Sequence, residues 1–214
     1  MADAIFLDRV VLGNYKSIKE CSVRLGPLTF LVGQNGAGKS NFLDALRLVS
    51  ESLNTTLEHA LRERGGINEV RRRSSGHPTH FGIRFDWRLP DGGHGVYAFR
   101  VGAKPKGGFE VKQEQCRVYP KEWRDLREAQ SFYVIEDGEL RDSSFNVGPP
   151  VSKDRLYLVA AAGFPPFLPL YNALSHMGFY NLNPDALCLA SRAWRGNMWE
   201  EKRPWHLVSR WEQK

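Results

Sequence analysis

The clearest pattern of apolar and polar residues lies between residues 28 and 53. The run Leu28–Val32 is almost entirely apolar, which is typical of a strand that is buried on both faces in a parallel sheet. A glycine-rich stretch follows. From Ser40 onward, apolar residues recur at steps of four, three and four, as on one face of an amphipathic helix. These residues are Phe42, Leu46, Val49 and Leu53. The pattern predicts a strand, a glycine-rich loop and a helix in succession.

Shorter patterns on either side of this unit predict antiparallel strands. Ile5–Val11 and Cys21–Leu25 have the apolar, β-branched character of strands and flank the turn-like stretch Gly13–Ser17, so we expect a hairpin or meander. Residues 81–135 alternate between apolar and polar positions, which indicates strands with one buried face. We expect strands within residues 81–87, 97–101, 109–119 and 132–135, with turns at 90–95, 104–108 and 137–138.

Two further helices and an irregular tail complete the predicted organisation. Thr55-Thr-Leu-Glu58 has the form of a capping box and Gly65-Gly66 supplies a stop, so a short helix through Arg64 is expected. Another is expected over Leu168–Met177, ended by Gly178. Four of the six tryptophans follow residue 193 at spacings that fit neither a helix nor a strand. We therefore predict an α/β lobe over residues 1–185 and an irregular, tryptophan-rich tail over residues 186–214.

Composition and charge narrow the class of protein only slightly. Of the 214 residues, 42% are hydrophobic and 25% are charged, which places the chain among globular proteins rather than disordered or collagen-like ones. The net charge of +6 is compatible with nucleic acid and with any other anionic ligand. Cys21, Cys116 and Cys188 are far apart and outside any Cys-x-x-Cys spacing, which argues against a disulfide framework or a zinc ribbon.

The sequence predicts a cytoplasmic protein without a membrane segment. Met1–Ala4 lacks the basic and then apolar regions of a secretory signal. Residues 156–184 contain no Asp, Glu, Lys or Arg, but Pro165, Pro166 and Pro169 interrupt them. We therefore expect this stretch to be buried in a soluble protein rather than to span a bilayer.

One motif carries recognisable chemistry. Gly33-Gln-Asn-Gly-Ala-Gly-Lys-Ser40 fits the phosphate-binding loop pattern G-x-x-x-x-G-K-[ST], and it lies between the predicted strand and the predicted helix, which is the context that this loop requires. Its glycines permit a tight turn in which successive backbone N–H groups surround a phosphate. The start of the following helix adds unpaired N–H groups and the positive end of its dipole. The pattern predicts a cradle for a nucleotide triphosphate.

Each residue of this loop has an expected role toward ATP and Mg²⁺. Lys39 reaches the β- and γ-phosphates as a point charge, and the Ser40 hydroxyl is the expected ligand of the metal. Nucleotide contacts are expected from nine consecutive residues: Gly33, Gln34, Asn35, Gly36, Ala37, Gly38, Lys39, Ser40 and Asn41. The sequence identifies no catalytic residue, because no hydrolytic triad is recognisable.

The motif and its surroundings resemble a known family. Asn14-Tyr-Lys-Ser-Ile18 together with Leu28–Leu46, and above all the form Asn-Gly-x-Gly-Lys-Ser-Asn, is similar to the N-terminus of ABC-type ATPases of the SMC, RecF and OLD kind. Gly178-Phe-Tyr-Asn-Leu-Asn-Pro184 looks like a stretch of bacterial AAA-type ATPases of this class. The resemblance covers about residues 5 to 185. It also implies that Lys16 and Ser17 lie near the adenine or the phosphates, whereas a structural turn is the alternative reading.

This resemblance implies an ATPase head made of two lobes. Lobe I holds the phosphate-binding loop and an antiparallel β layer, and heads associate head to tail so that a partner's signature motif closes over the γ-phosphate. The signature motif, the Walker B strand and the switch histidine are not found here as a set. Phe132–Asp137 mimics a Walker B strand, but Asp137-Gly138 favours a hairpin; Ser74-Ser-Gly76 lacks the leucine and second glycine of a signature. ATP binding is therefore expected, whereas hydrolysis is expected to need lobe II or a partner.

Several alternatives stay open at this point. The chain could be a non-hydrolysing nucleotide-binding or interaction protein, with the tail after Pro184 arising by truncation or a shifted reading frame. Another P-loop kinase or GTPase is a second alternative, although the guanine-reading Asn-Lys-x-Asp sequence is absent. Arg71–Arg73 could contact DNA phosphates or form a solvated loop. His77 and His80 lack a further ligand at metal spacing, so they do not predict a zinc site.

Overall fold

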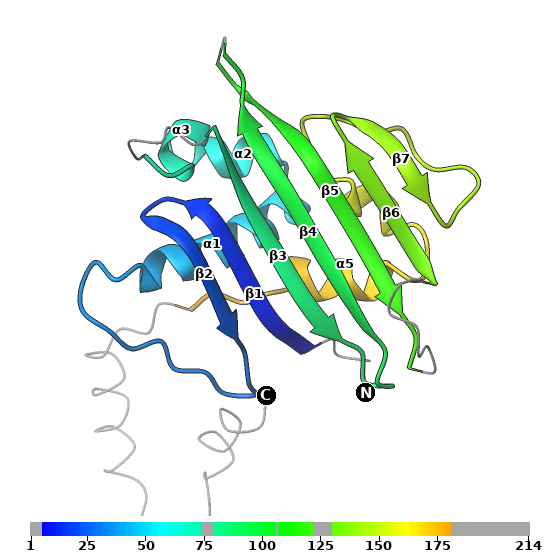
Figure 1. Cartoon of the computed structure of the whole chain (residues 1–214), viewed down its shortest axis with the longest axis horizontal. Helices are drawn as coiled ribbons and strands as arrows, with labels where there is room; N and C mark the ends of the chain where they lie inside the picture. The colour runs from blue at the N-terminus through cyan, green and yellow to red at the C-terminus, as the bar shows by residue number, and fades with distance from the viewer. Residues whose placement is uncertain (1–5, 74–78, 106, 122–129, 181–214) are drawn as a thin grey trace, which may run out of the picture. The chain divides into compact units, whose positions relative to one another are not determined.

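The computed structural model describes residues 6–73, 79–105, 107–121 and 130–180 (Figure 1). The chain divides into a larger unit, which includes residues up to Leu25 and Leu31–Met177, and a smaller unit, which includes Gly26–Phe30 and resumes at Gly178. All of the helices and strands described here belong to the larger unit. The predicted tail and the predicted boundary at residue 185 lie outside the described residues.

A seven-stranded sheet is the centre of the larger unit (Figure 1). Every neighbouring pair of strands is antiparallel, and the spatial order is β2-β1-β3-β4-β5-β6-β7. The strands are β1 (Phe6–Tyr15), β2 (Ile18–Arg24), β3 (His80–Arg88), β4 (His94–Ala103), β5 (Phe109–Tyr119), β6 (Ser131–Glu136) and β7 (Glu139–Ser143). From β3 onward each strand pairs with the next in sequence, so the middle of the chain is a run of antiparallel pairs, as its alternating pattern predicts.

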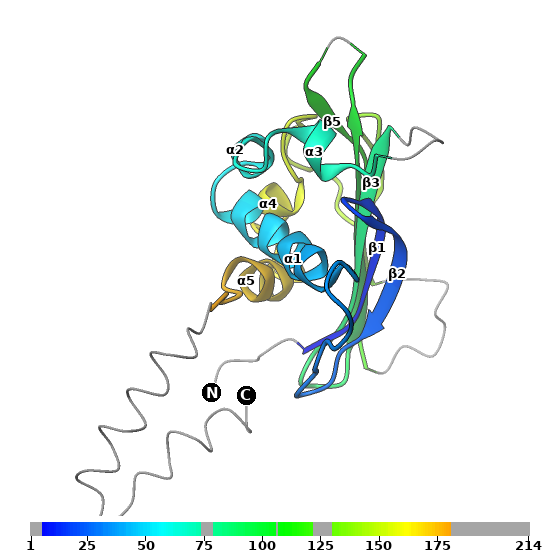
Figure 2. The same cartoon turned by 90° about the vertical axis from the view of Figure 1, so that its left-hand side faces the viewer.

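The helices of the larger unit cover one face of this sheet, as Figure 2 shows. They are α1 (Lys39–Asn54), α2 (Leu57–Arg62), α3 (Ile67–Val70), α4 (Leu158–Ala161) and α5 (Leu168–Ser175). The core lies between the helices and the sheet, because alternate residues of each strand point toward the helices. Examples are Phe81, Ile83, Phe85 and Trp87 on β3, which are at most 2% exposed. The stripe of α1 is buried in the same layer: Phe42, Leu46, Val49 and Leu53.

The predicted α/β class with an antiparallel β layer is confirmed, and so are the helices over residues 39–54 and 168–175. The expected capping box of α2 is wrong by one residue. Thr56 is the N-cap, and its hydroxyl accepts a hydrogen bond from the His59 amide at 3.0 Å. Thr55 instead ends α1, since its backbone N–H donates to the Glu51 carbonyl at 2.8 Å. Thr55 fits the pattern because Glu58 follows it by three positions, whereas Thr56 is followed by His59 and acts as a single threonine cap; the end of α1 at Thr55 moves the cap to Thr56.

The strand predicted over Leu28–Val32 is not formed. The structure has no regular element at these residues, and Leu28, Phe30 and Val32 are 59%, 77% and 89% exposed. A strand that is buried on both faces needs hydrogen-bonding partners along both edges. In the described parts of the chain no strand pairs with this segment. The phosphate-binding motif therefore follows an irregular segment rather than a strand.

A buried carboxylate connects the sheet to α4. Glu114 of β5 is 2% exposed and lies on the helix-covered face. Its Oε1 accepts hydrogen bonds from the hydroxyls of Tyr97 at 3.1 Å and Tyr133 at 2.9 Å and from the Leu158 amide at 2.8 Å, and its Oε2 accepts from the Tyr157 amide at 2.6 Å. Burial raises the pKa of Glu114 to about 7 although these four donors favour its charged form. The two amides begin α4, so this side chain fastens the C-terminal helices to the sheet.

Candidate functional site

The glycine-rich loop has the backbone conformation that its sequence predicts. Gly36 and Gly38 have φ values of 83° and 92°, and Gly33 has a φ of 154°, so all three adopt positive φ. Residues with a side chain rarely adopt such angles, and this explains why glycine recurs here. The Ala37 amide donates to the Gln34 carbonyl at 3.2 Å, which closes the turn. The loop remains largely exposed from Gly33 to Ala37, so an anion can reach its backbone.

The Lys39 ammonium folds back over the loop. Its Nζ donates to the carbonyls of Gly33 at 2.7 Å and Gln34 at 2.9 Å. A lysine in this position spans the whole turn and places one positive charge over it. The two carbonyls are neutral acceptors, so a phosphate oxygen would bind the ammonium more strongly than they do.

The first turn of α1 supplies the second half of an anion site. Gly38 is the N-cap and has no side chain to satisfy the first amides, and no acidic residue lies in the first turn. Unpaired N–H groups and the positive end of the helix dipole therefore face the loop. Ser40 is exposed at this end. The donor set fits a phosphorylated ligand, because it consists of backbone N–H groups, one ammonium and one hydroxyl and contains no carboxylate.

The turn between β1 and β2 packs against the same end of α1. A Cβ atom added to Gly38 would lie 3.2 Å from Ile18 Cγ1, so this glycine also permits close packing. The side-chain Nδ2 of Asn41 donates to the Ser17 hydroxyl at 2.7 Å. Asn41, which the sequence predicts to contact the nucleotide, therefore contacts the β1–β2 turn. The structure places Lys16 and Ser17 beside the first turns of α1, where they contact Asp44 and Asn41, so the turn has a structural role there. Their proximity to the adenine or the phosphates stays a prediction.

A cluster of charges that the sequence does not reveal lies beside this turn. Asp44 of α1 accepts hydrogen bonds from the Tyr15 hydroxyl at 2.8 Å and Arg64 Nε at 3.0 Å, and it pairs with Lys16 Nζ at 2.6 Å. Arg64 also contacts Glu51 Oε2 at 2.5 Å. Although burial opposes it, the hydrogen bonds from Lys16 and Tyr15 hold the pKa of Asp44 below its usual range. The only sequence signal for this cluster is that Asp44 follows Asn41 by three positions, which places both residues on one face of the helix.

The other segments considered from the sequence do not join this site. Phe132–Asp137 forms β6 and the hairpin turn to β7, with φ values of 50° at Asp137 and 79° at Gly138, so it is an outer strand pair of the antiparallel sheet. Arg71–Arg73 follow α3 and run beside the end of β1, where the Arg72 amide donates to the Asn14 carbonyl at 2.7 Å; Arg73 pairs with Glu69. Ser74–Gly76 and His77 lie outside the described residues. Within the described residues there is no group of three or more His, Cys, Asp or Glu side chains that could hold a metal.

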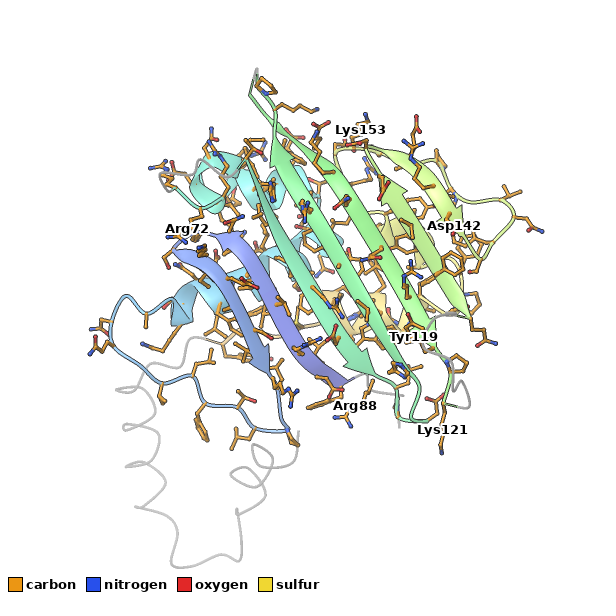
Figure 3. The ribbon with its side chains drawn as sticks, in the orientation of Figure 1. Arg72, Arg88, Tyr119, Lys121, Asp142 and Lys153 are labelled. Carbon is orange, nitrogen blue, oxygen red and sulfur yellow. The ribbon has the colours of Figure 1, made fainter. Side chains whose placement is uncertain are left out.

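The uncovered face of the sheet is a second exposed surface, seen in Figure 3. Arg72 lies at one end of it, near the β1–β2 turn, and Arg88 and Lys121 lie at the opposite end (Figure 3). Two of its arginines share one carboxylate: Asp86 pairs with Arg84 at 2.7 Å and also with Arg9. None of the helices in the described part of the chain is long and apolar enough to cross a membrane.

Comparisons with known proteins agree with the motif. A family model described as the AAA ATPase domain matches residues 6–134, which is more than half of the chain. The chain is 32% identical over 98 residues to an OLD nuclease of Thermus scotoductus, a match that covers 46% of this chain and 18% of that protein. A solved structure of the recombination mediator protein RecF, titled RecF-ATPrS in the RecFOR pathway, is similar with a TM-score of 0.35 and 20% identity, covering 57% of this chain and 29% of that one.

The chain belongs to the AAA ATPase domain family. This match confirms the prediction of an AAA-type ATPase domain, and the similarity to an OLD nuclease agrees with the predicted SMC/RecF/OLD-like group. The matched stretch spans less than a fifth of the OLD nuclease and less than a third of the RecF chain.

Proposed function

We propose that this chain binds ATP together with Mg²⁺ through Gly33–Ser40. The observation that carries the proposal is the exposed loop with three glycines at positive φ, which leads directly into the uncapped N-terminus of α1. Membership of the AAA ATPase domain family supports a nucleotide as the anion. The amides of the loop surround the phosphates, and Lys39 exchanges its two carbonyl partners for phosphate oxygens.

Mg²⁺ would be held by the Ser40 hydroxyl. This side chain is exposed beside the loop, and a hydroxyl with phosphate oxygens and water satisfies the preference of the ion for oxygen ligands. When bound, the ion neutralises part of the charge on the phosphates. The remaining residues of the proposed site contribute mainly through their backbones: Gly33, Gln34, Asn35, Gly36, Ala37 and Gly38. Asn41 contributes by holding Ser17.

The chain acts, in this proposal, as the nucleotide-binding lobe of an ATPase in DNA repair, maintenance or defence. The similarity to an OLD nuclease supports that setting, and the net charge of +6 is compatible with it. Hydrolysis needs a positioned water and groups around the γ-phosphate in addition to the cradle. Those groups come from a second lobe or from a head-to-tail partner. We also propose a cytoplasmic location, because the number and spacing of Cys21, Cys116 and Cys188 do not indicate a disulfide framework.

The decisive experiment compares thermal stabilisation by Mg-ATP in the wild-type protein and in Lys39→Ala. A ligand at about 100 times its Kd stabilises a protein by about 2.7 kcal/mol. We expect a concentration-dependent rise in Tm for the wild type and none for Lys39→Ala. Lys104→Ala is the matched control, because it removes an exposed lysine from the β4–β5 hairpin and should respond like the wild type. An equal rise in Tm for Lys39→Ala would refute the assignment.

Further arms of this experiment separate the remaining alternatives. GTP, and ATP with a chelator of divalent cations, test the choice of nucleotide and the need for Mg²⁺. Phosphate release by the purified chain tests whether it hydrolyses ATP alone; we expect binding without appreciable turnover. Light scattering with and without ATP tests for the head-to-tail dimer, which would double the mass.

A further inference from the structure

The turn between β1 and β2 runs alongside the beginning of α1 in a regular way. Gly38, Asn41 and Asp44 follow one another at intervals of three, so they lie on one face of the helix and its cap. Each of them contacts one residue of the turn, in reverse order along the chain. Gly38 packs closely against Ile18, and Asn41 donates a hydrogen bond of 2.7 Å to Ser17. Asp44 forms an ion pair of 2.6 Å with Lys16. The turn and the helix start therefore form one antiparallel set of contacts that begins at the phosphate-binding loop.

Asp44 is the residue of this set with the most partners. Its carboxylate receives donors from three separate segments: Tyr15 at the end of β1, Lys16 in the turn and Arg64 after α2. The Tyr15 side chain is fully buried and that of Arg64 is 7% exposed, so these donors have little access to water. An ion pair in such surroundings is geometrically demanding, and removing one partner leaves the others poorly satisfied.

The conformation of the turn explains why it needs this support. Asn14 and Lys16 have φ values of 55° and 47°, in the left-handed region that residues with a Cβ atom rarely adopt. Such a conformation persists only where surrounding contacts impose it. The Lys16 amide donates to the Val70 carbonyl at 2.7 Å on one side. On the other side, Asp44 binds the Lys16 ammonium and connects it to α1.

We propose that Asp44 is a positioning residue of the nucleotide site: by binding Tyr15 and Lys16 it holds the β1–β2 turn against Gly38 and thereby preorganises the phosphate-binding loop. This inference rests on the proposed function. Asp44 itself touches no phosphate, and its effect reaches the ligand through Ile18, Ser17 and the first turn of α1. A ligand that binds a preformed loop does not have to order it, so loss of Asp44 weakens binding.

The test uses the full chain and measures the Kd for Mg-ATP of four variants. Asp44→Asn removes the charge and presents an amide N–H₂ or a neutral oxygen to Lys16. Lys16→Met removes the same ion pair from the other end, and the double variant removes both partners. Glu51→Gln is the matched control, because it neutralises the other carboxylate bound to Arg64, and that carboxylate contacts Arg64 rather than the turn in the described part of the chain. Its amide oxygen can still accept from Arg64.

We expect Asp44→Asn and Lys16→Met each to raise the Kd about tenfold, which is typical for loosening a site through its supporting contacts. The double variant should bind no more weakly than Asp44→Asn, since that variant already lacks the ion pair that Lys16→Met removes. Glu51→Gln should bind like the wild type. Equal Kd values for Asp44→Asn and the wild type would overturn the proposal. So would tighter binding by Asp44→Asn, which would mean that Asp44 competes with the phosphates for Lys16.

A second measurement separates this inference from the proposed function. Hydrogen exchange of residues 38–46 in nucleotide-free protein should be faster in Asp44→Asn than in Glu51→Gln. If the wild type binds no nucleotide, the proposed function fails whatever the exchange shows. If the wild type binds and exchange is unchanged in Asp44→Asn, the positioning role fails alone.

Discussion

Glu114 makes the stability of this protein depend on pH in a direction opposite to that of an ordinary surface carboxylate. Its pKa is raised from 4.5 to about 7, chiefly by burial, so the folded state binds a proton more readily than the unfolded state. The linkage relation then requires the free energy of unfolding to fall as the pH rises from about 4.5 to about 7. Below this window the contribution is fully present, and above it the contribution is lost.

The size of the effect follows from the shift in pKa. One unit corresponds to about 1.4 kcal/mol, so the change from 4.5 to about 7 amounts to about 3 kcal/mol in the free energy of unfolding. Urea unfolding at a series of pH values, followed by tryptophan fluorescence, measures this quantity directly. The comparison is between the wild type and Glu114→Gln, which cannot titrate. Glu136→Gln serves as the control, because Glu136 is an exposed carboxylate on the neighbouring strand β6.

We expect the stability of the wild type and of Glu136→Gln to decrease across this window relative to that of Glu114→Gln. The glutamine variant should also be less stable than the wild type at low pH, because its N–H₂ group faces the Tyr157 amide where Oε2 accepts at 2.6 Å. Parallel pH profiles for all three proteins would refute the reasoning. They would show that the four hydrogen bonds fully compensate the burial of the charge.

Glycines at four positions give two further predictions, each with its own matched pair. Gly38→Ala should lower the free energy of unfolding by about 1–2 kcal/mol through its φ of 92° and further through the contact with Ile18, whereas Gly36→Ala, with a φ of 83°, meets open space and should show only the backbone cost. Urea unfolding checks both, and equal losses of stability would contradict the packing argument. Gly95→Ala places a methyl group into the Trp87 ring and 2.7 Å from the Arg117 carbonyl, and it should cost about 1–3 kcal/mol. Gly13→Ala, in a strand with open space, should change stability by less than about 0.5 kcal/mol; similar losses in both strand variants would show that packing is not the cause.

Much of the local structure follows from residues that are close in sequence. The alternation along β3 to β6 and the stripe of α1 are repeated patterns that match the geometry of a strand and of a helix, so they predict these elements without tertiary information. The glycines of the loop are equally local, because positive φ is a property of single residues. For the same reason the turn at Asp137-Gly138 is predictable and excludes a Walker B strand there.

The run Leu28–Val32 marks the limit of that reasoning. Its composition reports that these side chains favour burial, but a strand also needs partners, and those come from segments elsewhere in the chain or in another chain. The Thr55–Thr56 pair shows the same limit on a smaller scale, since the end of α1 selects the cap of α2.

The sequence alone determined the α/β class, the antiparallel layer and the glycine-rich loop, because each depends on residue type at short spacing. Tertiary structure decided that Tyr15, Lys16 and Arg64 meet at Asp44, and that Glu114 receives the first amides of α4. These contacts join residues up to 44 positions apart. Their partners are chosen by the packing of the helices on the sheet, and no local pattern records that choice.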